Sequence, residues 1–232
     1  MSIKDYEYNM QQLDAVAAAL GELNDEITYV GGATTALLVP EVAISGTRRT
    51  EDVDVLIDVL SRPEYYRFCD SLREKGFAED SGDDAVICRW LAPTKFGRVQ
   101  VDVMPTDPDI LGFSNRWYKQ AIALADKVTL PSGIKIRVVS APYFLATKLE
   151  AFKGRGKGDY FSHDLEDLVF VVENRDRLVV ELMSCDQELK SYLADEMKNL
   201  LNDQFLNVLP GLLVNQVAGD AVEQTLRLIS RW

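Results

Sequence analysis

The sequence has few of the residues that build disulfides, zinc sites and histidine-based catalytic centres. It contains one histidine, His163, and three scattered cysteines without a CxxC spacing. A single histidine excludes metal clusters built on several histidines and leaves only one Ser–His or Cys–His dyad to consider. The number and spacing of the cysteines argue against a disulfide framework and against a zinc site. We expect Cys69, Cys88 and Cys185 to be buried, reduced thiols.

Long hydrophobic runs are also missing. No apolar stretch approaches the ~18 residues of a membrane span, and the N-terminal segment MSIKDYEYNMQQLDAV is charged and lacks a signal-peptide core. We therefore expect a cytoplasmic protein without a membrane segment. The formal net charge of −12 disfavours broad, sequence-independent nucleic-acid binding, although it is compatible with a local basic groove.

A glycine pair near residue 30 suggests a phosphate-binding turn. The apolar run 27–30 is typical of a strand, and Gly31 and Gly32 suit a tight turn because glycine tolerates positive φ. The residues that follow are typical of a helix with Thr34 or Thr35 near its start. A glycine turn that enters a helix offers backbone N–H groups and the positive end of the helix dipole to a phosphate.

A strand with two aspartates on one face follows at residues 51–60. Val53 and Val55 alternate with Asp52 and Asp54, so the valines share one face and the aspartates the other. Carboxylates about 6.6 Å apart along one strand face repel each other unless a cation lies between them. Oxygen ligands without a nearby Cys or His suit Mg²⁺ or Mn²⁺ better than zinc.

A third aspartate lies in a later strand, residues 97–104, which we expect to pair with residues 84–91. Asp102 points away from its valine neighbours, Val101 and Val103. If this strand lies beside the acidic one, Asp102 is the third metal ligand. The alternative is an ordinary outward-facing aspartate. Because aspartate is depleted in strands, we favour the metal role.

The order of elements predicts an α+β fold with a mixed sheet, followed by helices. We place a soft boundary near Ser140, between a lobe of residues 1–140 and a helical lobe of residues 141–232. The expected helices before the boundary are 6–23, 33–39, 63–75 and 115–125, and a hairpin of 127–130 with 134–139 surrounds Pro131-Ser132-Gly133. The expected helices after it include 142–153 and 163–174.

The loop 40–50 ends in two arginines, Arg48 and Arg49. One interpretation is that an arginine contacts a phosphate or a substrate. The other is a solvated loop, or an ion pair with a neighbour of Asp52, since loop arginines are common.

A second charged cluster begins with Lys148, Lys153 and Arg155 and continues with Asp164 and Asp167. The two aspartates are three residues apart on an expected helix and share a face. Basic residues at a helix C-terminus often satisfy the last carbonyls and the dipole. That explanation suits Lys153 and Arg155 but not Lys148, which lies inside its helix.

The motif Gly31-Gly32 followed by Asp52-x-Asp54 resembles the signature of the DNA-polymerase-β-like nucleotidyltransferase superfamily. The resemblance implies that the glycines and the following threonine hydroxyl hold the triphosphate of an NTP. It implies that the paired aspartates, with a third carboxylate from a neighbouring strand, hold two metal ions. The 19 residues between Gly32 and Asp52 exceed the usual spacing, so residues 40–50 are expected to be an inserted loop.

Lys148, Arg155 and Asp164-x-x-Asp167 resemble the Lys…Arg…Asp-x-x-Asp motif of the AbiEii-type nucleotidyltransferases, the abortive-infection and toxin–antitoxin branch of that superfamily. The resemblance implies that Lys148 and Arg155 contact the nucleotide, that Asp164 is the catalytic base or organises the site, and that Asp167 supports it. His163 departs from the pattern, because the family favours a basic residue there.

These features predict a Mg²⁺- or Mn²⁺-dependent enzyme that moves NMP from an NTP, such as ATP, to a hydroxyl of a tRNA 3′ end, a protein or a small molecule. The resemblance implies a toxin with an antitoxin partner protein. Two alternatives stay open. One is a non-catalytic module of the same fold that binds a nucleotide or a partner. The other is a metal-dependent protein whose acidic strand is a solvated edge.

Overall fold

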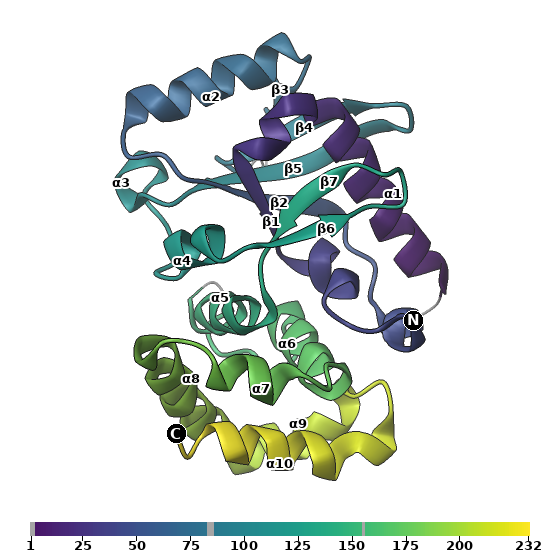
Figure 1. Cartoon of the computed structure of the whole chain (residues 1–232), viewed down its shortest axis with the longest axis vertical. Coiled ribbons are helices and arrows are strands. Elements are labelled where there is room, and N and C mark those ends of the chain that lie inside the picture. Colours follow the sequence, from purple (N-terminus) through teal and green to yellow (C-terminus); the bar gives the residue numbers. More distant parts are fainter. Residues whose placement is uncertain (1–2, 83–85, 155) are drawn as a thin grey trace.

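A seven-stranded mixed sheet forms the centre of one half of the molecule (Figure 1). The computed structural model describes residues 3–82, 86–154 and 156–232. The strands are arranged in the order β3-β4-β5-β2-β1-β7-β6. Their bounds are β1 (Ile27–Val30), β2 (Asp52–Ile57), β3 (Ala78–Glu79), β4 (Arg89–Thr94), β5 (Gly97–Pro105), β6 (Asp126–Thr129) and β7 (Lys135–Val138).

The sheet mixes parallel and antiparallel pairs. Strand β2 pairs with β1 in antiparallel and with β5 in parallel orientation. Strands β4 and β5 form one hairpin, β6 and β7 form another, and β1 pairs with β7 in parallel orientation. This arrangement confirms the predicted α+β class with a mixed sheet.

Helices flank the sheet, and the described regular elements that follow β7 are all helices (Figure 1). Helix α1 packs against β2, β4 and β5, whereas α4 packs against β1 and β2. The α-helices are α1 (Ile3–Leu20), α2 (Arg62–Glu74), α3 (Pro108–Leu111), α4 (Tyr118–Ala123), α5 (Ala141–Lys153), α6 (His163–Asn174), α7 (Leu178–Met183), α8 (Gln187–Leu200), α9 (Asp203–Leu212) and α10 (Gly219–Ile229). Short 3₁₀ helices span Gly21–Asp25, Gly32–Leu37, Glu41–Gly46 and Gln216–Ala218.

Local sequence signals explain several of these boundaries. The Ser61 side chain accepts a hydrogen bond from the Glu64 N–H at the start of α2, where a proline also occupies the first turn. The predicted helices 142–153 and 163–174 correspond to α5 and α6, and the hairpin around residues 131–133 is present. These predictions are confirmed because each depends on residues close together in the chain.

Other predicted bounds are wrong. The first helix ends at Leu20 rather than residue 23, because Gly21 takes a positive φ of 58° and starts a 3₁₀ helix. The helix predicted at 115–125 begins only at Tyr118, since the Asn115 side chain accepts a bond from the Trp117 N–H in the preceding turn. Strand β4 begins at Arg89 and continues to Thr94, so the hairpin turn is shorter than predicted. Residues 84 and 85 of the predicted strand lie outside the described residues.

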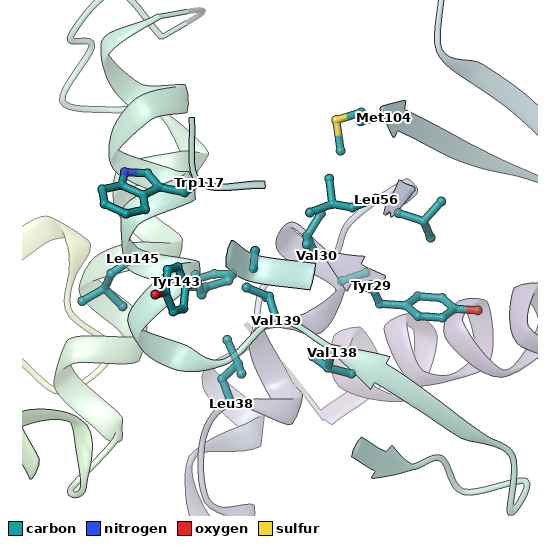
Figure 2. Close-up of a cluster of buried hydrophobic side chains, with 14 of the residues drawn as sticks. Tyr29, Val30, Leu38, Leu56, Met104, Trp117, Val138, Val139, Tyr143 and Leu145 are labelled. Carbon is teal, nitrogen blue, oxygen red and sulfur yellow. The ribbon is translucent and has the colours of Figure 1, made fainter. Parts of the chain in front are cut away.

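The hydrophobic core runs from the sheet into the helices (Figure 2). Val30 and Leu56 lie on the sheet side of this cluster, and Trp117, Tyr143 and Leu145 lie on the helical side (Figure 2). The predicted boundary near Ser140 lies between core residues on both sides, Val139 and Ala141, and stays a prediction. Cys69 and Cys88 are buried, Cys185 is half-buried, and all three are free thiols. Across the described ranges, every helix is too short or too polar to cross a membrane.

Candidate active site

Gly31 and Asp54 lie against each other at the end of β1. The antiparallel pairing of β1 with β2 places Val30 opposite Asp54, so Gly31 follows directly beside the aspartate. Gly31 has a φ of 76°, and a Cβ added there would lie 1.8 Å from Oδ2 of Asp54. Two independent reasons therefore require glycine here: the left-handed backbone and the space taken by the carboxylate.

Asp54 and Asp102 are direct partners in the parallel pairing of β2 with β5. Residues in register on neighbouring strands share a face and lie about 4.8 Å apart. Arg89 of β4 is the partner of Asp102 on its other side. One row of the sheet thus runs Arg89, Asp102, Asp54 and Val30 across four strands. The predicted adjacency of the two acidic strands is confirmed.

This row borders a cavity of about 480 Å³ between the sheet and helices α5 and α6. Its volume lies within the range of about 300–1,000 Å³ that is usual for small-molecule sites. Asp54 and Asp102 line it from the sheet, and Lys148 and Asp164 line it from the helices. Gly31, Cys88, Phe113 and Tyr118 also line the cavity. Asp52 is not one of the described residues that line this cavity.

Arg89 joins two of the three predicted metal ligands. Its Nε donates to Oδ1 of Asp102 at 2.8 Å, and its Nη2 donates to Oδ2 of Asp102 at 2.8 Å and to Oδ2 of Asp52 at 3.0 Å. The hydrogen bonds that Arg89 donates to Asp102 raise the pKa of Arg89 further, so the guanidinium is always charged. Asp52 is therefore turned toward Arg89.

The donor chemistry of the three aspartates fits Mg²⁺ or Mn²⁺, because both ions prefer carboxylate oxygens. Their arrangement fits a metal ion less well, since Arg89 already forms ion pairs with Asp52 and Asp102. Within the described part of the chain, no group of three or more His, Cys, Asp or Glu side chains is arranged to hold a metal ion. A divalent ion on all three aspartates would require the guanidinium to leave the oxygens of Asp52 and Asp102.

Four charged side chains form a second constellation, called here the buried ionic cluster: Arg48, Lys148, Asp164 and Asp167. Lys148 Nζ donates to Asp164 Oδ1 at 3.0 Å and to Asp167 Oδ2 at 2.7 Å. Arg48 donates through Nε and Nη2 to the two oxygens of Asp167, at 2.8 and 2.9 Å. The side chain of Asp167 is only 2% exposed. The cluster contains two positive and two negative groups, so its charges balance.

The charges of this cluster determine the ionisation of its members. Burial opposes charge on Asp167, but the neighbouring Lys148 and Arg48 outweigh it and hold the pKa of Asp167 below its usual value. Burial likewise opposes charge on Lys148, and Asp167 and Asp164 outweigh it and raise the pKa of that lysine. Both groups are therefore charged at neutral pH.

The ion pair of Arg48 with Asp167 was not predicted. The two residues are 119 positions apart, so no local pattern in the sequence links them. The interpretation that a loop arginine pairs with a neighbour of Asp52 holds for Arg49, whose Nε lies 2.9 Å from Oε1 of Glu51. Arg48 instead ties the segment before β2 to helix α6.

The two glycines of the pair have different neighbours. A Cβ on Gly32 would lie 2.5 Å from Nη2 of Arg48 and 2.6 Å from Cγ2 of Thr50. Gly32 therefore packs against Arg48, and of the pair only Gly31 lines the cavity.

The helix predicted at 33–39 is wrong: residues Gly32–Leu37 form a short 3₁₀ helix. Thr34 donates its hydroxyl to the Gly31 carbonyl at 2.8 Å, and Thr34 and Thr35 are both buried. Among the described residues, no partner lies within hydrogen-bond reach of the Thr35 hydroxyl. A six-residue segment does not carry the dipole of a long helix, so that argument for phosphate binding does not apply here. The phosphate roles of these threonines stay predictions, and Arg155 lies outside the described residues.

No protein-family model matches the sequence, and no curated protein matches it. The chain is similar to the crystal structure of an antigenic nucleotidyltransferase-like protein from Paracoccidioides brasiliensis, with 20% identity and a TM-score of 0.49. The alignment covers 81% of this chain and 87% of that chain. A likeness at this level does not assign a family or an activity.

Proposed function

We propose that this chain is a nucleotidyltransferase that moves NMP from an NTP to an acceptor hydroxyl in the cavity described above. The observation that supports it best is the alignment of Asp54 with Asp102 on neighbouring parallel strands, facing a cavity that Gly31 and Lys148 also line. Acidic strand residues beside a glycine turn and a buried lysine suit the charges of a triphosphate and its counterion.

In the proposed reaction, the acceptor oxygen attacks the α-phosphorus, the bond from that phosphorus to the bridging oxygen breaks, and pyrophosphate leaves. Mg²⁺ or Mn²⁺, held by Asp54 and Asp102 with Asp52, would stabilise charge on the attacking and leaving oxygens. Asp164 lines the cavity and is held by Lys148 at 3.0 Å. We assign to Asp164 the role of general base, which takes the proton from the attacking hydroxyl group.

The remaining residues bind and orient. Lys148 brings positive charge to the cavity wall, and Asp167 positions it through a bond of 2.7 Å. Gly31 exposes its backbone where a side chain would collide with Asp54. Phe113 and Tyr118 offer aromatic faces on which a base can stack.

The finer parts of the proposal concern the acceptor and the biological role. We retain a tRNA 3′ end, a protein hydroxyl or a small molecule as the acceptor, and a toxin with an antitoxin partner as the role. They rest on the resemblance of Lys148 and Asp164-x-x-Asp167 to the AbiEii-type motif.

A non-catalytic nucleotide- or partner-binding module is the second candidate, and one observation favours it. Arg89 bonds both Asp52 and Asp102, and so neutralises part of the charge that a metal would need. A module of this kind would bind a nucleotide without transferring its NMP.

A transfer assay separates these two functions. The protein is incubated with Mg²⁺, total tRNA and one α-³²P-labelled NTP at a time, in wild-type form and as Asp54→Asn. The matched control is Asp58→Asn, because Asp58 follows β2 and accepts a bond from the Thr106 hydroxyl at 3.0 Å. Label that moves to RNA or protein with wild type and Asp58→Asn, but not with Asp54→Asn, supports the enzyme.

The other outcomes are equally informative. Nucleotide-dependent thermal stabilisation without transfer would support the binding module. Neither transfer nor stabilisation with any of the four NTPs would refute both the transferase and the nucleotide-binding module.

A further inference from the structure

Arg89 occupies the position at which the acidic strands would otherwise need a cation. It is the direct strand partner of Asp102, and its three hydrogen bonds reach Asp102 and Asp52 from one guanidinium. Its side chain is 17% exposed, so water screens these contacts only partly. The contact with Asp102 is a two-bond fork, the geometry in which arginine binds carboxylates most strongly.

Electrostatics explains why a cation is needed there. Asp52 and Asp54 share one face of β2, and Asp102 lies beside Asp54 on the neighbouring strand. Three carboxylates in this arrangement repel one another unless positive charge lies among them. The guanidinium supplies that charge from within the chain, through the same oxygens that a divalent ion would take as ligands.

We propose that Arg89 competes with the divalent cation for Asp52 and Asp102, so that a metal ion binds both aspartates only when the guanidinium leaves them. The inference rests on the proposed function and adds a mode of regulation to the same site. Arg89 acts here as a positioning residue. It keeps the two carboxylates ordered without a metal, and it determines the metal concentration at which they bind the ion.

Mn²⁺ binding tests this directly and requires neither nucleotide nor turnover. Binding is measured by electron paramagnetic resonance and by calorimetry for wild type and Arg89→Gln. The variant loses the guanidinium that holds the oxygens of Asp52 and Asp102 at 2.8–3.0 Å. Because charge-assisted hydrogen bonds are the strong ones, it is expected to bind Mn²⁺ at least about tenfold more tightly.

Two further variants complete the experiment. Arg227→Gln is the matched control, because Arg227 lies on α10 and pairs with one carboxylate, Glu223, at 2.7 Å. It should bind Mn²⁺ as wild type does. Arg89→Lys keeps the charge but replaces the fork by a single ammonium. It should bind Mn²⁺ with an affinity between those of wild type and Arg89→Gln, and it serves in place of Arg89→Gln if that variant does not fold.

The competition is overturned if neither Arg89 variant binds Mn²⁺ more tightly than wild type. That result leaves the proposed function intact where the transfer assay succeeds. A tighter Mn²⁺ site in Arg89→Gln, together with no transfer by wild type, would retain the competition and remove nucleotidyl transfer. The two proposals therefore fail by different measurements.

Discussion

Replacement of Asp167 by asparagine probes the buried ionic cluster with the least change of shape. The substitution removes one negative charge and leaves Lys148 and Arg48 with Asp164 as the only carboxylate of the cluster. Lys148 keeps its bond of 3.0 Å to Asp164, whereas Arg48 loses the negative charge of the group that it contacts at 2.8 and 2.9 Å. An asparagine oxygen can accept one of these bonds but carries no charge.

The expected loss of stability follows from burial and charge. Removing one partner of a buried ion pair costs about 3–5 kcal/mol. The Arg48 side chain is 18% exposed, so water recovers part of that cost. We expect the free energy of unfolding to fall by about 3 kcal/mol, which for a chain of this size lowers Tm by about 6–12 °C.

Urea unfolding followed by tryptophan fluorescence and circular dichroism measures this change, provided that the slope m is the same in both proteins. The control is Asp195→Asn on α8, where the side chain is 72% exposed and pairs with Lys198 at 3.2 Å. It should lie within about 0.5 kcal/mol of wild type. If Asp167→Asn also stays within about 0.5 kcal/mol of wild type, the cluster does not stabilise the fold and the reasoning is refuted.

Three further predictions concern backbone, pH and thiol chemistry. Gly31→Ala should lower the urea midpoint more than Gly133→Ala, because both glycines have positive φ but only Gly31 has a carboxylate, that of Asp54, in the place of the new Cβ; equal shifts would contradict this. The pKa of Asp167 is lowered in the folded state, so its contribution to stability is present above the unfolded value of about 3.9 and is lost as pH falls through the folded value. At pH values below about 4, the urea concentration at the unfolding midpoint should therefore decrease. This decrease should be less steep in Asp167→Asn. Burial, with the charges of Asp102 and Asp54, raises the pKa of Cys88 to about 12, so the native thiol should resist iodoacetamide at pH 8, as read by peptide mass spectrometry, and react only after unfolding.

Elements with a local signal were predicted well. Helix α6 begins and ends where its apolar periodicity and flanking residues indicate, and the turn at residues 131–133 joins β6 to β7 as its Pro-Ser-Gly sequence predicts. The 3₁₀ helix Gly32–Leu37 was predicted as an α-helix because six residues are too few for periodicity to distinguish the two.

The candidate site was predicted only where a local sequence pattern indicates it. Alternation along single strands placed Asp52 with Asp54, and Asp102 opposite its valine neighbours. No local pattern indicated that Arg89 would approach these carboxylates. A basic residue within the strand that is expected to pair with the strand of Asp102 is the one sequence signal that points to it.

The sequence by itself determined which residues share a face of each helix and strand, because side-chain direction depends on a periodicity of a few residues. The tertiary structure alone decided which faces meet. The register of β2 with β5 aligns Asp54 with Asp102, and the packing of α6 brings Asp167 to Arg48, 119 positions away. Strand order, register and helix packing depend on burial across the whole core, so contacts between distant charges emerge only when the chain has folded.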